Sequence, residues 1–157
     1  MIPRHLLQGA LAGAAGTAAL NAATYIDMAV RARPASSTPE RTVERGAELL
    51  GLSMPADEEQ KNARESGLGA LLGIVTGVGV GAALGAVRGI TGRPHSSLGT
   101  VSAAWALAML AGNAPMTVLG VSDPRSWRAV DWIADVLPHL AYAGVAATAL
   151  DAIQRRP

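Results

Sequence analysis

The stretch GALLGIVTGVGVGAALGAVRG, from Gly69 to Gly89, decides the fold. Glycine recurs in it at every fourth position, and nearly all of the residues between are apolar. The repeated positions are Gly69, Gly73, Gly77, Gly81, Gly85 and Gly89. In a soluble helix each glycine would cost about 1 kcal/mol relative to alanine. In a bilayer, small residues instead let another helix backbone approach closely, so the stretch predicts a tightly packed membrane span.

The composition of the whole chain agrees with a membrane protein. Half of the 157 residues are hydrophobic, yet there is no Phe and only 3% of the residues are aromatic. Soluble cores usually use larger side chains to reach native packing density. The net charge of +1 is too small for the electrostatic footprint of a nucleic-acid-binding protein. The absence of Cys excludes disulfides, thiolate metal sites and cysteine nucleophiles.

Further apolar stretches are long enough to cross about 30 Å of hydrocarbon at about 20 residues each. The expected spans are residues 6–30, 68–90, 98–119 and 132–153, and a short turn over 92–97 joins the second to the third. The first is longer than a signal-peptide core, so we expect it to be retained. The sequence therefore predicts an all-α integral membrane four-helix bundle, one domain over residues 1–157, in the cytoplasmic (inner) membrane.

The connection between the first two spans predicts one more helix. The sequence STPE at 37–40 is typical of a helix start, with Ser37 accepting from backbone N–H groups and Pro39 in the first turn. Apolar residues then recur at helical spacing between charged ones. We expect a short amphipathic helix over residues 38–52, on the membrane surface or against the bundle. A solvated connector is the alternative. The charged segment 57–65 is expected to continue as helix into the second span.

The last span carries the residues that favour chemistry. Asp131, Asp135 and His139 follow one another at four-residue steps, so they neighbour one another on a helix, and Tyr142 lies one turn beyond. Ionisable groups inside a membrane cost about 2.5–3.5 kcal/mol at a helix centre and usually face partners or water. Because His titrates near neutrality, this titratable polar site indicates a proton or cation relay. A divalent metal bound by the two Asp and the His is one alternative. In the other, Asp131 marks the start of the helix in the headgroup zone, and Asp135 and His139 form hydrogen bonds with a partner helix.

Polar residues in the other spans are expected to hold helices together. They are Asn21, Tyr25, Asp27 and Asn113. Asp27 and Arg31 are four residues apart and are expected to pair. We expect Asn21 and Asn113 to form hydrogen bonds across helices, which are worth about 0.6 kcal/mol on average in bilayers. A place on a transport pathway is the alternative role.

The glycine face of the second span needs small partner residues on neighbouring helices. Such residues recur in the first span at Gly9, Gly13 and Thr17, and in the third at Ala104, Ala108 and Gly112. We expect the glycines to pack within one chain, and a seam between copies is the alternative. No nucleophile elbow, P-loop or HExxH motif occurs in the sequence, so we expect neither an enzyme nor a bound cofactor.

The segment 116–156 carries LGVSDP at 119–124, then Asp131 and Asp135, then HLAY at 139–142, and a final pair of arginines. This segment is similar to the C-terminal part of the YagU-like inner-membrane proteins, and the first span with residues 31–39 is similar too. The resemblance covers about half of the chain and leaves out the glycine stripe. It implies a small protein of the inner membrane without a settled biochemical activity, for which a contribution to acid resistance has been suggested.

Together these patterns predict a small non-enzymatic multi-pass membrane protein that handles protons or cations through Asp135 and His139, in pH homeostasis. The alternative is a structural or assembly subunit whose glycine-rich faces bind another membrane protein or a second copy. A membrane-embedded metalloenzyme on Asp131, Asp135 and His139 is the third class. The expected partner in every case is the lipid bilayer, and no nucleic acid is expected.

Overall fold

The computed structural model describes residues 2–91 and 97–155, and within these ranges the chain contains helices and no strand. The elements are α1 (Ile2–Arg31), α2 (Thr38–Leu49), α3 (Glu58–Thr91), α4 (Ser97–Val118), the 3-10 turn η1 (Pro124–Ser126) and α5 (Ala129–Gln154). The all-α prediction is therefore confirmed. Most of the turn expected over 92–97 lies outside the described residues.

The helix ends follow local signals, some of which differ from the expected ones. α3 begins ten residues before the expected span because the charged segment is helical, and Asp57 accepts a hydrogen bond from the Gln60 backbone N–H at 2.9 Å. Ser37 precedes α2 but makes no side-chain cap, so that prediction is wrong. α2 ends at Leu49, earlier than expected, because Gly51 takes a positive φ of 65° and closes the helix.

Three of the described helices are long and apolar enough to cross a membrane. They are α3, residues Leu98–Val118 of α4, and α5. α1 has the length but is not among them, because polar residues such as Gln8, Asn21 and Asp27 lower its mean hydropathy. The large apolar side chains exposed on all four long helices agree with a lipid-facing surface, because soluble monomers rarely expose contiguous apolar patches of this kind.

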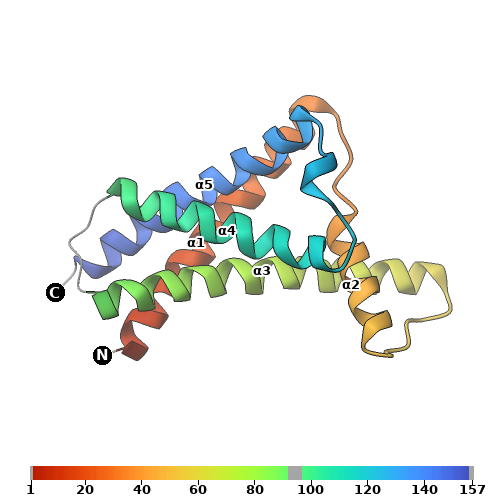
Figure 1. Ribbon diagram of the computed structural model, residues 1–157, viewed down its shortest axis with the longest axis horizontal. Coiled ribbons are helices and arrows are strands. Elements are labelled where there is room, and N and C mark those ends of the chain that lie inside the picture. Colours follow the sequence, from red (N-terminus) through yellow and green to blue (C-terminus); the bar gives the residue numbers. More distant parts are fainter. Residues whose placement is uncertain (1, 92–96, 156–157) are drawn as a thin grey trace.

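α1 lies at the centre of the arrangement, packed against α3 on one side and α5 on the other (Figure 1). Its first turn meets the last turn of α5, so these two helices run antiparallel. α4 packs mainly on α5, and α2 packs on the N-terminal part of α3. The small buried core draws on all four long helices, with Ala12, Leu84, Ala104 and Leu150 in one cluster. Of the partners expected in the third span, Ala104 and Ala108 lie in the core, whereas Gly112 lies against His139.

Glycines form the contact between α1 and α3. A Cβ on Gly81 would lie 2.5 Å from Gly13 Cα, and a Cβ on Gly85 would lie 2.8 Å from Gly9 Cα, so the backbones themselves touch. Gly77 lies against Thr17 on the same seam. The seam lies within one chain, as the sequence analysis expects, and the close approach requires glycine on both helices.

The other three glycines of the stripe have different surroundings. Gly89 lies against the His5 ring of α1, and Gly69 lies against Pro39 of α2, 3.1 Å from where its Cβ would be. A Cβ on Gly73 would meet no described atom within 4 Å. The expectation that Gly73 belongs to the packing surface is therefore wrong. Gly77 is the first glycine of the stripe that contacts α1, and Gly73 lies before it, where α1 and α3 diverge from their crossing (Figure 1).

Candidate functional site

The best-supported polar site joins α4 to α5 around Asp135. Asn113 of α4 donates a hydrogen bond from Nδ2 to Asp135 Oδ2 at 2.9 Å. On α5 itself, His139 Nδ1 lies 3.4 Å from Asp135 Oδ1 and 2.7 Å from the Asp135 backbone oxygen. The two side chains are only 14% and 19% exposed. Because both neighbours of Nδ1 are oxygens, this nitrogen carries the proton in the neutral ring.

The side-chain oxygen of Asn113 is a hydrogen-bond acceptor without a partner among the described residues at this site. This atom, Oδ1, is buried. A buried acceptor of this kind is usually satisfied by an ordered water or by a group that gains a proton. On the other side of the ring, a Cβ on Gly112 would lie 3.4 Å from His139 Nε2, so α4 approaches the imidazole with backbone rather than side chain. The site is compact and built from two helices.

Asp131 lies outside this cluster, contrary to the prediction. Its carboxylate accepts from the Arg128 backbone N–H at 3.0 Å and from Arg128 Nε at 3.1 Å, which caps the start of α5. On a helix, Asp131 is turned about 80° from His139, so the two do not share a face. The described residues contain no group of three His, Cys, Asp or Glu side chains arranged to hold a metal. The alternative of a metal site on Asp131, Asp135 and His139 is therefore not supported by the described residues.

Tyr142 also lies outside the cluster of Asp135 and His139, although the sequence analysis places it in the same polar site. It is 1% exposed, and its hydroxyl donates to the Gly77 backbone oxygen of α3 at 2.6 Å. Its ring lies against Gly16 of α1. Tyr142 therefore ties α5 to the glycine seam.

Of the other polar contacts expected from the sequence, some are present in the structure and some are not. Asp27 binds Arg31 Nη2 at 2.6 Å, as its spacing predicts, and also binds Arg33 Nε at 2.6 Å. Tyr25 is exposed, and Asn21 forms no side-chain hydrogen bond with any described residue. The predicted bond across helices is thus found for Asn113 and not for Asn21.

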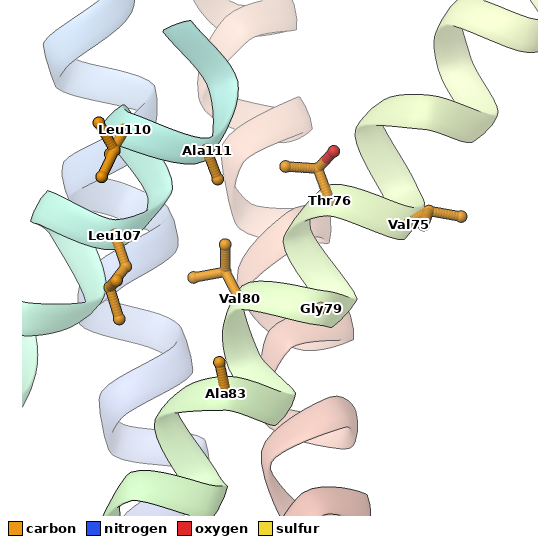
Figure 2. A pocket seen from close by; sticks show the side chains of 8 residues that line it. All are labelled: Val75, Thr76, Gly79, Val80, Ala83, Leu107, Leu110 and Ala111. Carbon is orange, nitrogen blue, oxygen red and sulfur yellow. The ribbon is translucent and has the colours of Figure 1, made fainter. Parts of the chain in front are cut away.

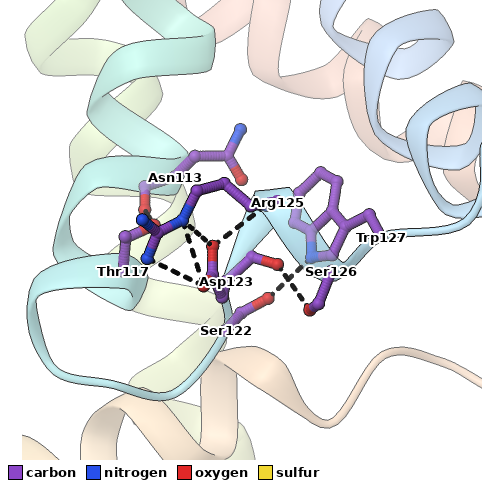
Figure 3. A network of polar contacts seen from close by, with 7 residues as sticks. All are labelled: Asn113, Thr117, Ser122, Asp123, Arg125, Ser126 and Trp127. Atoms are coloured by element: carbon purple, nitrogen blue, oxygen red, sulfur yellow. Dashed lines mark hydrogen bonds and ion pairs between the residues drawn. The ribbon is translucent and has the colours of Figure 1, made fainter.

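A turn covers the end of the bundle near the Asp135 site. Asp123 accepts from the Arg125 backbone N–H at 2.9 Å and pairs with the guanidinium, and Trp127 Nε1 donates to Ser122 Oγ at 2.9 Å (Figure 3). The Arg125 side chain is the main cause that lowers the pKa of Asp123 below its ordinary value. The turn lies beside the C-terminal end of α4, near Asn113 and Thr117 (Figure 3).

The sequence analysis missed a second polar cluster at the opposite end of α5. Arg88 Nη1 lies 2.6 Å from Asp151 Oδ1, and Arg88 Nη2 donates to Thr100 Oγ1 at 2.7 Å. Gln154 contacts both Arg88 and His5 at 3.4 Å. These residues lie far apart along the chain. The one signal for them is a charge placed near the end of each of two apolar spans.

The chemistry available at the Asp135 site is proton exchange, because a carboxylate and an imidazole share a buried position with one orphan acceptor. The surrounding residues supply donors that hold the carboxylate in place. Comparisons of this chain with protein-family models, with curated proteins and with solved structures find no match.

Proposed function

We propose that this chain is a small multi-pass protein of the cytoplasmic membrane, with α1, α3, α4 and α5 as its spans, and that it passes protons or small cations through a site at Asp135 and His139. The proposal includes α1 as a span because it is packed between two helices that are apolar enough to cross a membrane. Partners of this kind can hold a moderately polar helix in the bilayer.

The observation that carries the proposal is the placing of Asp135 between Asn113 and His139. At 1.5 Å per residue, Asp135 lies about 9 Å and His139 about 15 Å along α5 from its start, so both lie within a 30 Å hydrocarbon layer that begins there. An ionised carboxylate at such depth is costly unless it is hydrogen-bonded or protonated.

The resemblance of residues 116–156 to the YagU-like proteins leads in the same direction. A contribution to acid resistance has been suggested for that family, and a proton-exchanging site would serve it. The residues that carry the resemblance include Asp135 and His139.

Proton flux into liposomes tests the proposal. Purified protein is reconstituted with a pH-sensitive dye inside and valinomycin with K⁺ to balance the charge. We expect the wild type to acidify the lumen faster than protein-free liposomes, and Asp135→Asn and His139→Ala to abolish the difference. Asp131→Asn is the matched control, because that carboxylate is bound to Arg128 at the start of the helix. Wild-type flux no faster than that of empty liposomes would refute the proposal.

A second candidate function, assembly with another membrane protein, is favoured by one observation. An open groove of about 400 Å³ separates α3 from α4 (Figure 2). It is lined by Val75, Thr76, Gly79, Val80, Ala83, Leu107, Leu110 and Ala111. The seam glycines are already covered by α1, so a partner helix would have to use this groove, where Gly79 and Ala83 allow close approach.

Native mass spectrometry in mild detergent tests this candidate. We expect Gly79→Leu, which fills the groove, to release a co-purifying membrane protein. Gly144→Leu is a control on α5, because its added Cβ also meets no described atom within 4 Å. A wild-type chain that is monomeric and alone in every detergent would exclude assembly as the function.

A further inference from the structure

The Arg88–Asp151 cluster is a second polar site inside the bundle. All four long helices contribute to it: His5 from α1, Arg88 from α3, Thr100 from α4, and Asp151 with Gln154 from α5. The side chains of Arg88 and Asp151 are only 11% and 13% exposed. A buried ion pair is a weak source of stability, because desolvation offsets most of the attraction. Ionisable groups at such positions are instead a mark of function in membrane proteins.

An orphan acceptor lies in the same part of the core. Gln8 is 9% exposed, and its Oε1 has no hydrogen-bond partner among the described residues. Gln8 is one turn before Ala12 on the inward face of α1, and Ala12 belongs to the core cluster that contains Leu150. The acceptor is therefore near the level of Asp151. Leaving it unpaired would cost about 1–3 kcal/mol, so this part of the core is suited to an ordered water.

The two polar sites lie at opposite ends of one helix. Asp135 and Asp151 are about 24 Å apart along α5 at 1.5 Å per residue, which approaches the thickness of the hydrocarbon layer. The inward face of α5 between them is apolar and buried, from Tyr142 to Leu150. Each site is thus placed to exchange with a different side of the membrane, and a dry segment separates them.

The donors at both sites favour a proton over a metal cation as the species exchanged. Asp135 faces N–H groups of Asn113 and His139, and Asp151 faces the guanidinium of Arg88. Metal cations such as Ca²⁺ require about six to eight oxygen ligands, and N–H donors directed at a carboxylate occupy that space. A proton requires a single carboxylate oxygen.

We propose that Asp151, paired with Arg88, is a second proton-accepting site of the bundle, and that protons rather than metal cations are the species that Asp151 and Asp135 exchange, each with its own side of the membrane. The proposal rests on the proposed function of Asp135 and names its substrate. In the step at Asp151, a hydronium ion gives its proton to a carboxylate oxygen, an O–H bond forms, and water leaves. Arg88 loses its counter-ion and keeps its bonds to Thr100 and Gln154. The reverse step returns the proton to water.

The groups that face Asp151 come from all four long helices. Among the described residues these are Arg88 from α3, Arg155 on α5 at 4.0 Å, and His5 from α1 through Gln154, while α4 contributes the uncharged Thr100.

Proton flux with substitutions at this cluster is the first test. A positioned proton-transfer group is worth about 10²–10⁴-fold in rate, so we expect Asp151→Asn to slow flux about 100-fold and Asp151→Glu to restore much of it. Thr148→Val, at an exposed position on the same helix, should leave flux unchanged. Replacing external Na⁺ with choline should also leave wild-type flux unchanged.

The outcomes separate this inference from the proposed function. If no form of the protein conducts protons, the function proposed for Asp135 fails. If the wild type conducts and Asp151→Asn conducts equally well, the second site alone is wrong. A wild-type flux that requires Na⁺ would overturn the choice of the proton.

Infrared difference spectroscopy keeps the inference testable even where Asp151→Asn does not fold. On acidification of the wild type, we expect two carbonyl bands from protonated carboxylic acids, one of which Asp135→Asn removes. Asp151→Glu should shift the other band, because the protonated group then belongs to a different side chain. A spectrum of Asp151→Glu identical to that of the wild type would show that this carboxylate takes up no proton.

Discussion

The seam between α1 and α3 makes a sharp prediction for Gly81→Ala. The added Cβ would lie 2.5 Å from Gly13 Cα and 2.6 Å from Gly13 N, and closer still to the Gly9 oxygen. Ordinary contact begins at 3.4 Å, so α1 has to move away by about 0.9 Å. A gap of that size removes about a quarter to a half of each dispersion contact across the seam. Overpacking of this kind costs about 1–3 kcal/mol, so we expect a loss of about 2 kcal/mol.

Gly73→Ala is the matched control on the same helix. Its Cβ would meet no described atom within 4 Å, and alanine is a better helix former than glycine by up to about 1 kcal/mol. Both variants are unfolded with SDS in mixed micelles and followed by circular dichroism. We expect Gly81→Ala to unfold at lower SDS than the wild type, and Gly73→Ala to unfold at equal or higher SDS. Equal midpoints for the two variants would refute the backbone-to-backbone seam.

Three further changes probe the core, the link between α5 and α3, and the turn. Leu150→Ala empties a fully buried position and should cost about 2–5 kcal/mol in the same SDS titration, whereas Leu137→Ala at an exposed position should cost little. Tyr142→Phe removes the hydrogen bond to α3, and we expect a loss of about 0.6 kcal/mol with proton flux retained. Carbon-detected NMR should show Asp123 titrating below 3.8, and Arg125→Gln should raise that pKa. Because the folded pKa is lowered, its contribution to stability is present above 3.8 and is lost as pH falls through the folded value.

The helices were predictable from the sequence because long apolar runs and charge spacing are local signals. The pairing of Asp135 with His139 was predictable for the same reason, since residues four apart touch on any helix. Asp27 with Arg31 is a second case. The start of α3 shows the limit of hydropathy, because a charged segment continues the same helix.

Which charged side chains meet between helices was not predictable, because that depends on how the helices cross. Arg88 and Asp151 come from different spans, and no spacing rule relates them. The four-residue stripes mislead in both spans. Gly73 lies outside the crossing of α1 and α3, and Asp131, which is turned about 80° from His139 around α5, is bound by Arg128 instead.

The place of α1 has a consequence for how the protein is made. Among the described long helices, α1 is the one that is not apolar enough to span by itself, and it is synthesised before α3 and α5. Its contacts with α3 and α5 do not exist until both of those helices have been synthesised. In the four-span arrangement proposed above, α1 depends during that interval on the insertion machinery and the lipid to stay in the bilayer. In that arrangement, insertion of α1 is completed only when translation has reached α5.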